Sequence, residues 1–144
     1  MATPAPPAPG LPTLMTVYPG AAEQARHVRA DLRQFLNGCP VADDVILCAS
    51  ELVANAAIHS ASRLPGRTFS VRAEVHQDSH VLILVSDCGG AWTDRPADPT
   101  RGRGLDIVRA YASDHGIITT AAGRTVWARF AWQSADGAAS GPER

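Results

Sequence analysis

The pattern of apolar and polar positions along the chain changes its period from segment to segment. In some segments apolar residues alternate with polar ones or follow one another without a break, which is typical of strands. In others they recur every three or four residues, which is typical of helices with one buried face. The pattern predicts strands at 14–18, 68–77, 80–86, 116–120 and 124–132, and helices at about 21–37, 41–60 and 104–113.

Two consecutive strands indicate what kind of sheet this is. In 68–77, the apolar Phe69 and Val71 alternate with the polar Ser70 and Arg72, as in a sheet with one wet face. The segment 80–86 is almost uniformly apolar, as expected in the middle of a sheet. A one-sided sheet combined with amphipathic helices predicts an α+β fold, a two-layer sandwich of a mixed, mostly antiparallel sheet with helices on one face.

The helix predicted at 41–60 carries two polar residues beside its apolar arc. Glu51 and Asn55 are four residues apart, so they lie one above the other at the edge of that arc. An amide oxygen is a suitable neutral ligand for Mg²⁺, and a carboxylate can act as a general base. The alternative is that both are ordinary solvated helix residues, and for this spacing by itself we prefer that interpretation.

Glycines follow the apolar strand at 80–86. Asp87 lies at the end of this strand, and Gly89 and Gly90 follow shortly after it. The two glycines permit close approach of the backbone to a ligand. A carboxylate there can accept a hydrogen bond from an exocyclic amine such as that of adenine. An Asp turn closing a hairpin, where Asp and Gly are both favoured, explains the same residues about equally well.

A second glycine-rich segment opens the helix at 104–113. Free backbone N–H groups at a helix N-terminus form an anion site when glycines allow close approach. Two arginines lie beside the glycines, and the segment comprises Arg101, Gly102, Arg103, Gly104 and Leu105. The alternative is a loop-to-helix junction that merely needs glycine. The conjunction of the three motifs, in this order, indicates a pocket for a nucleotide and its magnesium ion.

Composition narrows the class of protein. With 144 residues, one domain is expected at 13–134, between a disordered Pro- and Ala-rich tail at 1–12 and a flexible tail at 135–144. A net charge of −1 provides no general attraction to nucleic acid or to an anionic membrane. All 13 basic residues are arginine, which excludes a Walker-type loop with its lysine. No membrane span or secretory signal is recognised, so a cytoplasmic location is expected.

The three cysteines, Cys39, Cys48 and Cys88, form an odd count without the spacing of a metal site. Reduced thiols are therefore expected rather than disulfides or metal ligands.

Taken together, the three motifs resemble those of the histidine-kinase-like ATPases of the Bergerat fold, especially the small anti-sigma-factor serine kinases of actinobacterial kind. The resemblance covers about residues 14–132. The segment Glu51–Ala56 is similar to the family's N box, Asp87–Gly90 to its first glycine box, Gly102–Val108 to its second, and Gly123–Phe130 to its closing strand. The first box departs from the usual D-x-G-x-G, because position 91 is Ala.

The resemblance implies ATP or ADP with Mg²⁺ as cofactors, and a role for each motif. Asn55 would hold Mg²⁺, Glu51 would be the general base, and Asp87 would bind the adenine amine. Gly89 and Gly90 would shape the base pocket. Gly102 and Gly104 of the second box would cradle the phosphates, and Arg101, Arg103 and Leu105 would also belong to the nucleotide site. The short segment 91–101 would form a small phosphate lid.

By the same resemblance, the protein would be a serine/threonine kinase that regulates transcription. Its partners would be an anti-anti-sigma protein of STAS type, a sigma factor, or both, and it would form a homodimer, with no direct contact to nucleic acid or membrane. The alternative is a catalytically degenerate module that binds nucleotide or partner without transferring phosphate. Retention of Glu51 favours the kinase, since nucleotide binding alone does not need that carboxylate.

Overall fold

The computed structural model describes residues 10–59, 66–77, 79–87, 103–120 and 123–132, with side chains left out at 57–59 and 103–105. Nearly all of both predicted tails, the predicted lid, and Cys88, Gly89, Gly90 and Gly102 of the two glycine boxes lie outside the described residues. Of the helices in the described part of the chain, none is long and apolar enough to cross a membrane.

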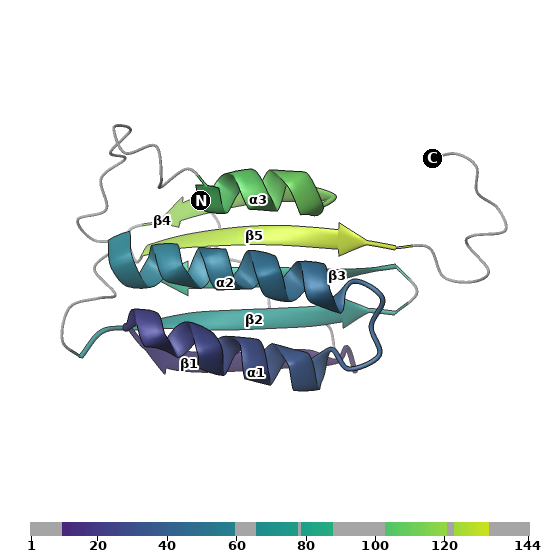
Figure 1. Ribbon diagram of the computed structural model, residues 1–144, viewed down its shortest axis with the longest axis horizontal. Coiled ribbons are helices and arrows are strands. Elements are labelled where there is room, and N and C mark those ends of the chain that lie inside the picture. The colour runs from purple at the N-terminus through teal and green to yellow at the C-terminus, as the bar shows by residue number, and fades with distance from the viewer. Residues whose placement is uncertain (1–9, 60–65, 78, 88–102, 121–122, 133–144) are drawn as a thin grey trace, which may run out of the picture.

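In the described part of the chain, the sheet is built from five strands in the order β1-β2-β3-β5-β4, and each of its four strand pairings is antiparallel (Figure 1). Its strands are β1 Thr13–Pro19, β2 Thr68–His76, β3 His80–Asp87, β4 Asp114–Thr120 and β5 Gly123–Ala131. The almost uniformly apolar β3 occupies the centre of the sheet, as its sequence predicts, since a central strand contacts neighbours on both edges and side chains on both faces.

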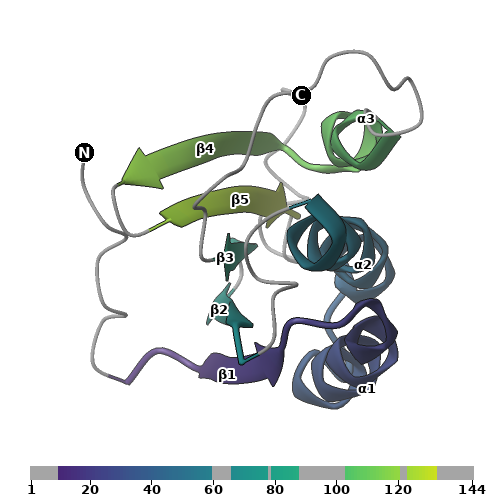
Figure 2. The same ribbon diagram turned by 90° about the vertical axis from the view of Figure 1, so that its left-hand side faces the viewer.

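The helices cover one face of this sheet (Figure 2). They are α1 Ala25–Phe35, preceded by the single 3₁₀ turn η1 Ala22–Gln24, then α2 Ala42–His59 and α3 Arg103–Tyr111. In Figure 2, α2 lies between α1 and α3, and the strands are all on the other side. The predicted α+β sandwich with helices on one face is thereby confirmed. The first helix differs in detail, because its first turn is 3₁₀ rather than α.

The core lies between the helices and the sheet. The apolar arc of α2 is buried as predicted, with Val45, Ala49 and Val53 fully inaccessible to solvent. It meets large side chains from the strands, of which Phe69 on β2 and Phe130 on β5 are at most 1% exposed. Burying aromatic and branched side chains from both layers is the main source of stability in such a sandwich, and it fixes α2 over the sheet.

The face of the sheet without helices differs from its prediction. Alternation along β2 predicts that Glu74 faces water, but the residue is only 5% exposed. Arg72 Nε lies 2.9 Å from one oxygen of its carboxylate in an ion pair, and His76 Nε2 lies 3.1 Å from the other oxygen. A buried carboxylate needs such partners, because desolvation without them is costly. Neighbouring long side chains, which periodicity does not take into account, therefore cover part of the supposed wet face.

Tyr18 ties the edge strand β1 to α1. Its hydroxyl donates a 2.7 Å hydrogen bond to Asp31 Oδ2, and its ring stacks on Phe69 with centroids 5.4 Å apart. Burial, followed by the hydrogen bond to Asp31 and the negative charge of that carboxylate, raises the pKa of Tyr18 to about 12. The folded state therefore favours the protonated phenol.

This coupling predicts a loss of stability at alkaline pH that depends on Tyr18. In the unfolded chain the phenol ionises near its ordinary pKa of about 10. The contribution of the protonated Tyr18 to the free energy of unfolding is therefore complete below pH 10 and is lost as the pH rises toward 12. Tyr18→Phe should cost about 1–2 kcal/mol at pH 8 and should show a smaller decline by pH 11. Urea unfolding at both pH values tests this, with the exposed Tyr111→Phe as control. An equal alkaline decline in wild type and Tyr18→Phe would contradict it.

Candidate functional site

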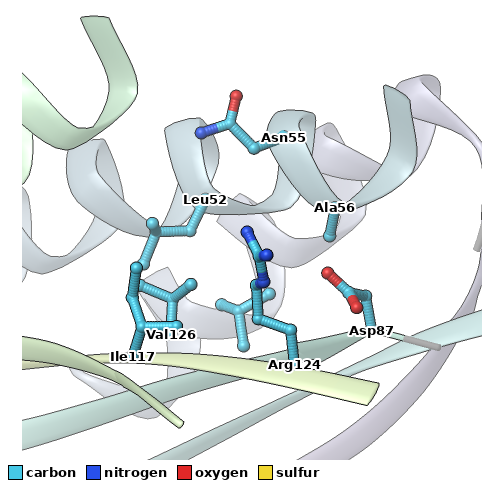
Figure 3. Close-up of a pocket in the computed structure, with 8 residues that line it drawn as sticks. Leu52, Asn55, Ala56, Asp87, Ile117, Arg124 and Val126 are labelled. Atoms are coloured by element: carbon cyan, nitrogen blue, oxygen red, sulfur yellow. The ribbon is translucent and has the colours of Figure 1, made fainter. Parts of the chain in front are cut away.

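A hollow lies between α2 and the end of the sheet where β3 finishes and β5 begins (Figure 3). Its cavity volume is about 40 Å³, and its described walls come from α2, β3, β4 and β5. The side chains that line it are those of Leu52, Asn55, Ala56, Val85, Asp87, Ile117, Arg124 and Val126. Five of these eight are aliphatic, and the other three carry an amide, a carboxylate and a guanidinium. The lining therefore combines apolar side chains with a few polar groups, as ligand sites do.

The sheet register determines which charged groups share the hollow. Asp87 is the last residue of β3, and Arg124 is the second residue of β5, directly opposite it. Because directly opposed residues in an antiparallel pair project to the same face, both side chains leave the sheet on the helix side. Figure 3 shows both directed from the sheet toward α2, whereas the amide of Asn55, which comes from α2, points away from the sheet.

A hydrogen bond fastens the two strands beside these charges. Ser86 Oγ and Thr125 Oγ1 are 2.7 Å apart on the opposite face of the same strands. These residues immediately precede Asp87 and follow Arg124, and they too are directly opposed in the register. The pair holds the ends of β3 and β5 together, so the backbone that carries both charged side chains is well positioned.

Glu51 lies on α2 one turn before Asn55 and is half-buried, but it is not among the residues that line the hollow. At 100° per residue, Glu51, Asn55 and Cys48 fall on one side of α2. The Cys48 thiol is 3.8 Å from the carbonyl oxygen of Ile107, so this side faces α3. Burial, then the negative charges of Asp44 and Glu51, raise the pKa of Cys48 to about 11. Glu51 therefore belongs to a polar strip between α2 and α3, beside the hollow.

Of the residues predicted to form the site, Asn55 and Asp87 come together in the hollow although they belong to different elements. Gly89, Gly90, Arg101 and Gly102 lie outside the described residues. The predicted helix after the second glycine segment does form, and α3 begins at Arg103, but the side chains of 103–105 are not described. The general base, metal ligand and base-binding roles of these residues stay predictions.

Arg124 was not predicted from the sequence as a site residue. Its only sequence signal is its place at the start of an alternating strand, and that pattern does not reveal which residue of another strand lies opposite. Cys39 and Cys48 are free thiols, as expected. In the part of the chain that is described, no group of three histidine, cysteine, aspartate or glutamate side chains is arranged to hold a metal ion.

Comparison with known proteins gives a consistent family. A sequence model of the histidine kinase-like ATPase domain matches residues 17–130. The fold is similar to the crystal structure of the RsbU and RsbW domains of Rv1364c from Mycobacterium tuberculosis, with a TM-score of 0.66 and 26% sequence identity. That match covers 83% of this chain and 32% of the other, so this chain spans about a third of that one.

A second solved structure, the histidine kinase domain of a blue-light activated histidine kinase from Erythrobacter litoralis EL346, is more distant. Its TM-score is 0.49 and its identity 14%, over 76% of this chain and 59% of that chain.

Proposed function

The chain belongs to the histidine kinase-like ATPase family, and on that premise we propose that it binds ATP with Mg²⁺ and phosphorylates a serine of an anti-anti-sigma protein of STAS type. The observation that carries this proposal is the meeting of Asn55 and Asp87 at one hollow. The sequence motifs assign a metal ligand and a base-binding carboxylate to these two residues, and such roles require them to share a site.

The chemistry of the hollow fits a nucleotide. Asp87 offers a carboxylate that can accept a hydrogen bond from the exocyclic amine of adenine. Leu52, Val85 and Val126 supply apolar surface for the faces of a planar base. The amide oxygen of Asn55 suits Mg²⁺, which prefers hard oxygen ligands and usually keeps several waters and phosphate oxygens. When bound, the nucleotide would supply the phosphoryl group and the metal ion would neutralise charge on the phosphate oxygens.

Glu51 and the start of α3 provide the remaining functions in this proposal. Glu51 would accept the proton of the serine hydroxyl, because its carboxylate lies one turn from Asn55 on the same helix. Backbone N–H groups at the N-terminus of α3, together with Arg101 and Arg103, would bind the phosphates. Most of the catalytic effect would come from positioning and charge neutralisation.

The proposed partners rest on resemblance to anti-sigma-factor serine kinases, which the likeness to a structure containing an RsbW domain supports. We infer that the protein controls transcription from the cytoplasm by phosphorylating the STAS-type protein, sequestering a sigma factor, or both. A homodimer would use β1, whose Met15 and Val17 are 57% and 59% exposed at the edge of the sheet. Exposed apolar side chains on an edge strand favour association.

Titration with ADP in the presence and absence of Mg²⁺ tests this function. Mg²⁺ should tighten ADP binding by about tenfold or more, equivalent to roughly 1.4 kcal/mol for the added metal contacts. Asn55→Ala should reduce that Mg²⁺ effect to less than about twofold, because the protein then lacks the proposed ligand. Isothermal titration calorimetry measures both values.

The matched control is Asn37→Ala, which removes the chain's other asparagine, an exposed residue beyond the end of α1. Its titrations should equal those of the wild type. If the wild-type protein binds neither ADP nor ATP at millimolar concentration, the proposed function is wrong, and the alternative of a partner-binding module without nucleotide is favoured.

A further inference from the structure

We propose that the Arg124 side chain occupies the base site of the nucleotide-free protein and competes with the nucleotide base for Asp87. This inference rests on the proposed nucleotide binding and adds a control on the affinity of that site. Three features of the structure support it, namely the strand register, the size of the hollow and the chemistry of its other walls.

The register holds Arg124 next to the carboxylate that the base would use. Asp87 and Arg124 are directly opposed on β3 and β5, and both line the hollow. Opposite charges at directly opposed positions of an antiparallel pair attract one another. In Figure 3 the guanidinium of Arg124 lies between the sheet and α2, beside Asp87, rather than turned out toward solvent. The side chain is therefore directed into the site.

The hollow is too small to hold a nucleotide base while Arg124 is directed into it. A cavity of about 40 Å³ is far smaller than the roughly 300–1,000 Å³ of typical small-molecule sites. It has room for a few waters at most. Several other walls are short or branched aliphatic side chains, including Ala56, Val85 and Val126. These cannot retract far, whereas an arginine side chain has several rotatable bonds and can swing aside.

The Arg124 side chain can also move out of the hollow into solvent. Arg124 is half-buried, and Ile117 of β4, which lines the same hollow and is opposed to Val126 of β5, is 48% exposed. The hollow therefore opens to solvent near the edge of the sheet. A guanidinium that leaves the hollow is hydrated, and a base that enters takes over the contact with Asp87. The apparent dissociation constant is then raised by the fraction of molecules in which Arg124 blocks the site.

Adenosine is the probe that isolates this effect. It carries the base without phosphates, so removing a positive charge from the protein does not weaken its binding through lost attraction to anions. If nine of ten wild-type molecules are blocked, Arg124→Ala should bind adenosine about tenfold more tightly than the wild type. Arg124→Lys, which keeps a long cationic side chain, should stay within about threefold of the wild type. Calorimetry at fixed ionic strength gives these ratios.

The control variant is Arg129→Ala, which removes an exposed arginine of the same strand that projects to the other face of the sheet. It should bind adenosine as the wild type does. Arg124→Gln provides a second shortened, neutral side chain if Arg124→Ala does not fold, and it should also tighten binding. Circular dichroism and thermal unfolding establish that each variant is folded.

The outcomes separate this inference from the proposed function. If adenosine binds the wild type, and Arg124→Ala and Arg124→Gln bind it equally or more weakly, Arg124 does not block the site and the inference is overturned while nucleotide binding stands. If the wild type and all variants fail to bind adenosine and ADP, the nucleotide site itself is refuted, and the inference with it. The inference is supported only if Arg124→Ala and Arg124→Gln both bind adenosine more tightly than the wild type.

Discussion

Glu51→Gln is expected to lower phosphoryl transfer to the partner protein by roughly 100- to 10,000-fold, the usual contribution of a general base. Glutamine has nearly the same size as glutamate but cannot accept the proton of a serine hydroxyl. ADP binding should stay within about twofold of the wild type, since Glu51 is not among the residues lining the hollow. The measurement is transfer from labelled ATP to STAS-type proteins of the same organism, with calorimetry for ADP.

The control for this experiment is Glu23→Gln in η1, an exposed glutamate remote from the hollow in sequence. Glu51→Ala should behave like Glu51→Gln. Transfer by Glu51→Gln at the wild-type rate would remove Glu51 from the mechanism. A loss of ADP binding equal to the loss of transfer would indicate instead that Glu51 supports the nucleotide site.

Asp87→Asn is expected to weaken ADP binding by roughly 10- to 150-fold, which corresponds to about 1.5–3 kcal/mol for a hydrogen bond to a charged group. Asp87 is the carboxylate that reaches the hollow from β3, and the proposal assigns it the exocyclic amine of the base. Because asparagine keeps the shape but not the charge, the variant tests the chemistry rather than the packing. Calorimetry with Mg²⁺ and ADP measures the change.

Two comparisons sharpen this test. Asp43→Asn changes an exposed aspartate in the first turn of α2 and should leave ADP affinity within about twofold of the wild type. Repeating Asp87→Asn in the Arg124→Ala background measures the contact with the base when no guanidinium competes for the carboxylate. Unchanged affinity in both backgrounds would show that Asp87 does not hold the base.

The meeting of Asn55 and Asp87 also bears on the two interpretations left open by the sequence. An isolated Glu-x-x-x-Asn on a helix is more often a solvated pair, and an Asp with glycines at the end of a strand is about equally often a hairpin turn. The structure places Asn55 and Asp87 at one hollow with apolar walls. Independent placement of solvated residues gives no reason for this convergence, so the functional interpretation of both is favoured.

The sequence by itself determined the secondary structure and its layering. Period-two and helical patterns are local, and they placed each strand and helix to within a few residues, including the central position of β3. Local patterns also identified Asn55 and Asp87 as candidates, because the chemistry of a side chain and its place at a helix edge or strand end can be recognised without the fold. The family match over residues 17–130 agrees with those motifs.

Only the tertiary structure decided which side chains meet. The pairing of Asp87 with Arg124 depends on the register between β3 and β5, which a strand pattern does not specify, because every even shift of register preserves the alternation. Burial of Glu74 likewise depends on the cover that Arg72 and His76 provide. Sequence periodicity shows which face a residue takes, whereas contacts between faces arise from long-range packing. For this reason only the tertiary structure identified Arg124 as a residue of the candidate site.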